Sequence, residues 1–250
     1  MTPAITPLIA GNWKMNGLAA ALGEIDRLGA LLAADNPRCI VAICPPATLL
    51  ARVTERAATA GIVTGGQDCH ARASGPHTGD ISAAMLADAG AKYVIVGHSE
   101  RRTDHNEDDV TVRAKALAAV SSGLTPIICV GETRAEREAG RAVAVVSSQL
   151  SASVPDEAAA QDVVVAYEPV WAIGTGLTPT IDDIRAMHDG IRAQLAGRFG
   201  RAGERIPLLY GGSMKPANAR EILAVDNVNG GLVGGASLLA NDFFAIISAV

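Results

Sequence analysis

The chain has 250 residues, of which 49% are hydrophobic, and this suits one large domain with a buried core over residues 1–250. A formal net charge of −5 and an aromatic content of 3% provide neither the basic surface nor the stacking side chains of nucleic-acid-binding proteins, so we expect no nucleic-acid partner. No run approaches the roughly 20 apolar residues that span a bilayer, and the cysteines form no CxxC pair, so we expect a cytoplasmic protein with reduced thiols and no membrane partner.

Eight short runs rich in β-branched residues recur along the chain, separated by longer stretches rich in alanine and leucine. Nearly all of the runs are continuously apolar, as expected for parallel strands buried on both faces. The stretches between them, such as 106–120, 180–199 and 216–225, carry apolar residues at helical spacing. The sequence therefore predicts an α/β fold, a (β/α)8 barrel with an outer ring of helices. The expected strands are Ile5 to Gly11, Arg38 to Cys44, Gly61 to Gly66, Tyr93 to Val96, Pro126 to Val130, Val163 to Tyr167, Ile206 to Tyr210 and Val228 to Val233.

Two local signals indicate where helices begin. Thr133 followed by Glu136 has the spacing of a capping box, which predicts a helix start after the fifth strand. Pro216 suits the first turn of the helix after the seventh strand, because an N–H at that position has no intrahelical partner.

Polar and glycine-rich motifs follow five of the expected strands. They are NWKMN at 12–16, GHSERR at 97–102, AYEPVWAIGTG at 166–176, YGGS at 210–213 and VGGAS at 233–237. Because the carboxyl ends of barrel strands all meet at one rim, where barrel enzymes place their active sites, we expect these motifs to surround one pocket.

The carboxylate at the end of the sixth strand is the candidate general base. Glu168 can take a proton from carbon if apolar neighbours exclude water and raise its basicity. On position alone, a rim carboxylate paired with a nearby lysine or arginine is an equally good reading.

Proton removal beside a carbonyl places negative charge on oxygen, so the pocket needs donors aimed at that oxygen. His98 and Lys14 are the rim candidates, with Asn12 beside Lys14. A Schiff-base enzyme would instead need a lysine deeper in the barrel, and the expected strands contain none.

Glycine backbone N–H groups can closely approach the oxygens of a phosphate at a helix N-terminus. Gly234 and Gly235 precede the expected eighth helix, and Ser213 and Gly174 can converge on the same place. The segment from Pro169 to Pro179 is too rich in glycine for a helix, and its apolar residues suit a lid that closes over the substrate.

A metal site is not expected. Cys69, His70 and His77 lie near one another in the sequence but lack a fourth ligand and fall in an expected loop. These two histidines, with His105 and His188, are interpreted as structural residues.

The five motifs, in order and over the whole chain, resemble those of the triosephosphate isomerases. The resemblance implies a cofactor-free isomerase of glycolysis and gluconeogenesis that interconverts dihydroxyacetone phosphate and D-glyceraldehyde 3-phosphate through an enediolate. It implies that Glu168 is the base, that His98 is a neutral imidazole electrophile, and that Lys14 and Asn12 act in catalysis and substrate binding. Ser99, Glu100 and Thr78 occupy supporting positions, Glu100 beside Lys14. These supporting roles follow from motif position alone.

The resemblance also implies a homodimer formed through the loop from Asp68 to Asp80, with Thr78 at its tip, and a contact between Glu132 and the lid residue Trp171. Three positions depart from the family pattern. His77 replaces an aromatic residue and Asp80 a glutamate that pairs with an arginine matching Arg101. Pro179 lies in the lid hinge, where we expect it to change the lid rate.

Two other functions fit parts of this pattern. An isomerase of a slightly larger ketose phosphate, such as a tetrulose phosphate, would use the same base, electrophile and phosphate site. A non-catalytic barrel that binds phosphorylated metabolites would need only the phosphate site, but the presence of Glu168, His98 and Lys14 disfavours it.

Overall fold

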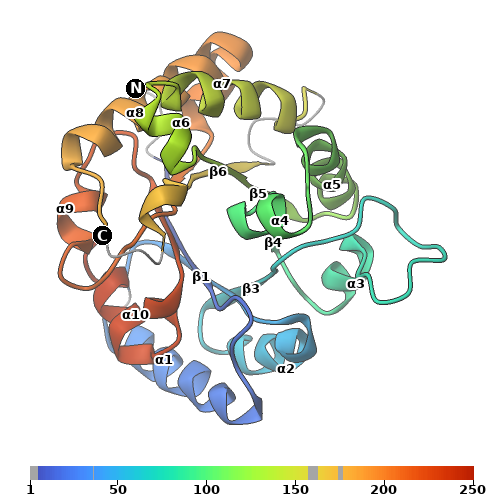
Figure 1. Cartoon of the computed structure of the whole chain (residues 1–250). Coiled ribbons are helices and arrows are strands. Elements are labelled where there is room, and N and C mark those ends of the chain that lie inside the picture. Colours follow the sequence, from blue (N-terminus) through green and yellow to red (C-terminus); the bar gives the residue numbers. More distant parts are fainter. Residues whose placement is uncertain (1–4, 36, 157–162, 174–176) are drawn as a thin grey trace.

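The computed structural model describes residues 5–35, 37–156, 163–173 and 177–250. Within them, eight strands follow one another around a closed parallel barrel, because β8 pairs with β1 (Figure 1). All eight predicted strands are confirmed, with small shifts at their ends. They are β1 (Leu8–Asn12), β2 (Ile40–Cys44), β3 (Ile62–Gly66), β4 (Tyr93–Val96), β5 (Thr125–Val130), β6 (Val164–Tyr167), β7 (Leu208–Tyr210) and β8 (Gly230–Val233).

Helices surround the barrel, and neighbours in the ring pack on one another, as α1 does on α2 and α10 (Figure 1). Short 3-10 turns cover 19–21, 170–172, 200–205 and 235–237. The α-helices are α1 (Leu22–Asp35), α2 (Ala47–Ala57), α3 (Ala83–Asp88), α4 (Ser99–Asp104), α5 (Asp109–Ser121), α6 (Arg134–Glu138), α7 (Ala142–Ser153), α8 (Ile181–Phe199), α9 (Ala219–Leu223) and α10 (Ala240–Ile247).

Of the two helix starts predicted from the sequence, one is confirmed and the other is wrong. The capping box of Thr133 and Glu136 is present at the start of α6, so that prediction is confirmed. The placement of Pro216 in the first turn of a helix is wrong, because α9 begins at Ala219. Pro216 lies in the turn just before it, where the backbone N–H groups of Asn218 and Ala219 both donate to the Lys215 carbonyl.

The alternating side chains of each strand divide the apolar core into two layers. Leu8 and Ala10 of β1 point into the barrel, whereas Ile9 packs outward against the helices. The barrel interior is filled by side chains, including Ile95, Ile127 and Leu209. A filled interior leaves the strand ends as the place for a pocket. Among the described residues, no helix combines the length and apolar character needed to cross a membrane.

Candidate active site

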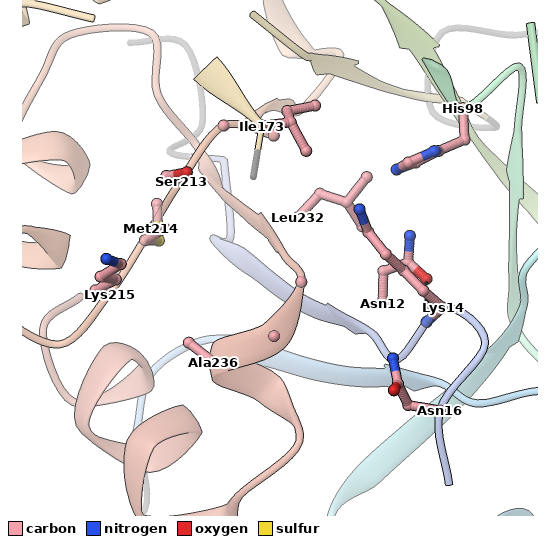
Figure 2. A pocket seen from close by; sticks show the side chains of 14 residues that line it. Asn12, Lys14, Asn16, His98, Ile173, Ser213, Met214, Lys215, Leu232 and Ala236 are labelled. Carbon is pink, nitrogen blue, oxygen red and sulfur yellow. Dashed lines mark hydrogen bonds between the residues drawn. The ribbon is translucent and has the colours of Figure 1, made fainter. Parts of the chain in front are cut away.

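A cavity of about 460 Å³ opens at the carboxyl ends of the strands. Figure 2 shows the His98 ring and the Lys14 ammonium reaching toward the same part of it, with Ser213 and Ala236 on other sides. The cavity therefore joins motifs from distant parts of the sequence, as the barrel topology predicts. Its lining consists of Asn12, Lys14, Asn16, His98, Ile173, Gly211, Gly212, Ser213, Met214, Lys215, Leu232, Gly234, Gly235 and Ala236.

Lys14 is held in an unusual backbone conformation, with φ of 52°. Its N–H donates to the side-chain oxygen of Asn12 over 3.0 Å, and its carbonyl accepts from the Gln67 amide over 2.8 Å. These two bonds fix a left-handed residue that costs strain, a feature that clusters at functional sites. The Lys14 ammonium pairs with Glu100 at 2.6 Å, so the expected contact between these two residues is present.

His98 immediately follows β4 and forms the N-cap of α4. Its Nδ1 accepts from the Glu100 backbone N–H over 3.2 Å, which leaves this nitrogen without a proton. The ring proton therefore lies on Nε2, which is 2.9 Å from Oε1 of Glu168. The local fold thus fixes both the orientation of the ring and its tautomer.

Glu168 follows β6 and is only 1% exposed. In this conformation it does not line the cavity and instead lies behind His98, where Ser99 donates its N–H to Oε2 (3.0 Å) and its hydroxyl to Oε1 (3.2 Å). The structure brings the expected base next to the expected electrophile, but in this conformation the carboxylate faces Ser99 and His98 and not the cavity.

The electrostatics of this pair depend on the position of Glu168. Burial raises the pKa of Glu168, but His98 and the Ser99 amide lower it more, so the net pKa lies below the ordinary value. The expectation of raised basicity is therefore wrong for this conformation. Burial lowers the pKa of His98, and Glu168 raises it above the ordinary value. If Glu168 rotates away, burial and Lys14 remain and favour the neutral ring.

The glycine-rich motifs form the opposite side of the cavity. Gly234 caps the 3-10 turn 235–237 and Gly235 is its first residue, so a short turn separates these glycines from the last helix, α10. A Cβ atom at Gly235 would meet nothing within 4 Å, and one at Gly234 would lie 3.6 Å from Cε of Lys14. The backbone here is open to an anion and lies beside the Lys14 side chain.

The expected lid begins as a 3-10 turn, Val170–Ala172, which corrects the expectation of a segment without helical structure. Trp171 donates its ring N–H to Glu132 over 2.8 Å, as the resemblance implied, and the Arg137 guanidinium lies 4.7 Å from the Trp171 ring centre. Ser213 donates to the Ala172 carbonyl over 2.9 Å. The expected phosphate ligand Gly174 lies outside the described residues.

A partly buried ion cluster connects the loop after β3 to the helices that follow β4. It consists of Asp68, Arg101, Glu107 and Lys115, joined by contacts of 2.6 to 2.9 Å. Arg101 therefore pairs with Asp68 and Glu107, whereas Asp80 lies 3.9 Å from His70. Thr78, at the tip of this loop, is exposed and does not line the cavity.

Sequence reasoning missed several residues that shape the site. Leu232 of β8 lines the cavity as an apolar wall. Cys129 donates a side-chain hydrogen bond to Glu168 that lowers the pKa of the carboxyl. A Cβ atom at Gly131 would lie 1.7 Å from the Glu168 carbonyl oxygen, and one at Gly211 would lie 2.9 Å from its Cγ. Each of these residues lies at or near the carboxyl end of a strand, and this position was the signal by which the sequence could have identified it.

Comparison with known proteins gives consistent matches over the whole chain. A family model described as triosephosphate isomerase matches residues 7–250. The triosephosphate isomerase of Afipia carboxidovorans is 64% identical over 249 residues, covering 100% of this chain and 99% of the relative, and that of Jannaschia sp. is 60% identical, covering 97% of each. A crystal structure of triosephosphate isomerase from Bartonella henselae superimposes with a TM-score of 0.92 at 48% identity, covering 98% of this chain and 99% of that one.

Proposed function

The chain belongs to the triosephosphate isomerase family, and from this premise we propose how its own residues carry out the reaction. It is an isomerase that interconverts dihydroxyacetone phosphate and D-glyceraldehyde 3-phosphate. The observation that carries the proposed roles is the convergence of Lys14, His98 and the 234–235 glycines on one cavity, with Glu168 in contact with His98.

The phosphate group binds at the glycine side of the cavity. Backbone N–H groups at Gly234 and Gly235 supply donors, and the Lys14 ammonium supplies positive charge. The hydroxyl of Ser213 becomes a further donor once it turns away from the Ala172 carbonyl. Gly174 is proposed as a further donor from its place in the lid sequence. Fixing the phosphate places the two reacting carbons toward His98.

Glu168 acts as the base after it leaves Ser99. Its carboxylate removes a proton from the hydroxymethyl carbon of dihydroxyacetone phosphate, and the electron pair moves to form an enediolate with charge on the former carbonyl oxygen. The same carboxyl group returns the proton to the neighbouring carbon while a proton moves between the two oxygens, which yields the aldehyde. Loss of the Ser99 and His98 bonds raises the basicity of Glu168 as it rotates.

His98 and Lys14 stabilise the developing charge. The Nε2–H that now donates to Glu168 becomes available to the substrate oxygen once the carboxylate moves. Asn12 positions Lys14 through its backbone N–H, Glu100 restrains the ammonium, and Ser99 holds Glu168 in the resting state. Closure of the lid excludes water and strengthens these interactions.

We also propose a homodimer through the loop from Asp68 to Asp80, with Thr78 reaching the partner. In support, this loop projects beyond the ring of helices near α3 (Figure 1), and Thr78 is exposed. The side chain of Met15, beside Lys14, is 96% exposed in the single chain, which favours a partner that covers it. Sedimentation analysis of the purified protein tests this, and a monomer at micromolar concentration would contradict it.

A single-domain protein working in the cytoplasm is proposed as well. The described residues form one continuous barrel, and Cys44, Cys69 and Cys129 are buried free thiols, which suits a reducing compartment.

The test is the rate at which the purified protein converts D-glyceraldehyde 3-phosphate, without added cofactor, in the wild type, Glu168→Gln and Glu138→Gln. Removing the base should lower kcat by about 10²-fold to 10⁴-fold, whereas Glu138 is an exposed carboxylate on α6 and should be dispensable. A Glu168→Gln enzyme with wild-type turnover would contradict the proposed base. Slow turnover of the triose by the wild type, with fast turnover of a tetrulose phosphate, would contradict the substrate assignment.

A further inference from the structure

The loop between β3 and α3 brings two imidazoles and one carboxylate together. The backbone N–H of His70 donates to the Ile81 carbonyl over 2.8 Å, and His70 forms a bridge to Ser82, which closes the base of the loop. The N–H of Asp80 donates to the His77 carbonyl over 3.0 Å, which closes the tip. These main-chain bonds place side chains from both arms of the loop side by side.

The three side chains have the separation that a metal ion needs. One ligand atom from each of His70, His77 and Asp80 lies within 4.8 Å of the other two, and Nε2 of His70 is 3.9 Å from Oδ2 of Asp80. Ligand atoms on a tetrahedral zinc lie about 3.4 Å apart, as follows from bonds of about 2.1 Å. The two imidazole rings now stack with 4.0 Å between their centres and 33° between their planes, so they must tilt apart for one nitrogen of each ring to face the same ion.

His77 carries a nitrogen without a partner. Its Nε2 is buried and makes no hydrogen bond to any described residue, although buried polar atoms usually have one. Gly75, with φ of 142°, lies against this edge of the ring, and a Cβ atom there would come within 3.2 Å of Nε2. The glycine thus leaves room beside a nitrogen that a cation would satisfy.

The surrounding charges are compatible with a cation. Arg101, which lines the adjoining pocket together with His70 and Asp80, is already paired with Asp68 and Glu107. Nδ1 of His70 accepts from the exposed N–H of Arg72 over 3.1 Å. A metal on Nε2 would move the ring proton to Nδ1, so this single solvent-exposed bond would be exchanged for the metal bond.

We propose that His70, His77 and Asp80 form a binding site for a divalent transition metal, of which zinc is the probe of choice. Two imidazoles and a carboxylate suit Zn²⁺, Ni²⁺ and Cu²⁺ better than Mg²⁺ or Ca²⁺. The carboxylate side chain is 56% exposed in the single chain, which leaves space for water to complete the coordination. The ion would act as a clip across the loop, separate from the cavity that holds the substrate.

From the sequence alone, the residues considered as metal ligands were Cys69, His70 and His77. Cys69 precedes His70, but its thiol is buried and directed toward the Lys115 carbonyl at 3.7 Å, away from the proposed ligands. Asp80 takes its place because the loop folds back. The fold thus supplies a third protein ligand in place of the cysteine, and the fourth position is left to water.

Zinc binding to the metal-stripped, full-length protein tests the proposal by competition with a chromophoric chelator. We expect one zinc per chain, with an affinity that falls by about tenfold or more in His77→Phe and in Asp80→Asn. His105→Gln, which alters an exposed histidine outside the cluster, should bind zinc as the wild type does. Circular dichroism without zinc verifies that each variant is folded.

Two further readouts make the result decisive. Electron paramagnetic resonance of bound Cu²⁺ should report two imidazole nitrogens in the wild type and one in His77→Phe. Equal zinc affinity in the wild type and both ligand variants, or no binding by the wild type at millimolar zinc, would overturn the proposal. Because binding and spectroscopy do not depend on turnover, the result is independent of the isomerase assignment.

Discussion

His188 provides a quantitative test of the packing behind the active site. It lies on the inner face of α8, is fully buried, and contacts the Tyr167 ring edge-on with 5.9 Å between ring centres. Its Nδ1 is 3.1 Å from the Asn227 carbonyl, and its Nε2 has no partner among the described residues. Burial lowers the pKa of His188 from 6.5 to about 4. Folding therefore requires the neutral ring.

The pH dependence follows from this shift. Between pH 6.5 and 4 the unfolded chain binds a proton that the folded chain excludes, so the free energy of unfolding falls as the pH falls. The contribution is fully present above the unfolded pKa. Linkage gives a loss of about 2 kcal/mol at pH 5 and about 3 kcal/mol at pH 4 from this one group.

Urea unfolding of the wild type and His188→Gln, at one protein concentration and at several pH values, isolates the effect. All other titrating groups are common to both proteins, so the difference between their unfolding free energies should shrink by about 2 kcal/mol from pH 7.5 to pH 5. The glutamine amide can still donate to the Asn227 carbonyl. Parallel curves, with a difference constant to within about 0.5 kcal/mol, would refute the reasoning because they would mean that His188 titrates equally in both states.

Three further changes test other parts of the account. Lys115→Met leaves Asp68 and Glu107 of the ion cluster without one of their cations, so it should lower the free energy of unfolding by about 3 kcal/mol in urea titrations. The control is Arg134→Met, which breaks an exposed ion pair and should have no measurable effect. Glu132→Gln replaces the anion that accepts from Trp171, so the lid should leave this position more readily, and stopped-flow tryptophan fluorescence should show faster relaxation. An unchanged relaxation rate would contradict the idea that the hydrogen bond from Trp171 to Glu132 holds the lid in this position. Gly211→Ala places a Cβ atom 2.9 Å from Cγ of Glu168 and should lower kcat without preventing phosphate binding, which inhibition by inorganic phosphate measures.

The sequence predicted the barrel and most of the cavity for one physical reason. Continuously apolar strands alternate with amphipathic helices, and parallel strands of a closed barrel deliver their carboxyl ends to one rim. Asn12, His98 and Gly234 each lie at such an end, so position along the chain was sufficient to bring them together.

What the sequence could not predict depends on side-chain rotation and loop closure. The position of Glu168 after β6 was foreseen, but its rotation toward Ser99 depends on an amide and a hydroxyl contributed by another βα unit. In the same way, Asp80 joins His70 and His77 through main-chain bonds within an irregular loop. Neither arrangement leaves a periodic signal in the sequence.

The central claim is that Glu168 leaves Ser99 and enters the cavity when substrate binds. The most direct test is a crystal structure of the protein with a phosphate-bearing analogue of the planar enediolate. We predict the Glu168 carboxylate beside the reacting carbons, the His98 Nε2–H donating to an analogue oxygen, and the phosphate at Gly234 and Gly235. An analogue bound in the cavity with Glu168 still accepting from the Ser99 N–H would contradict the account.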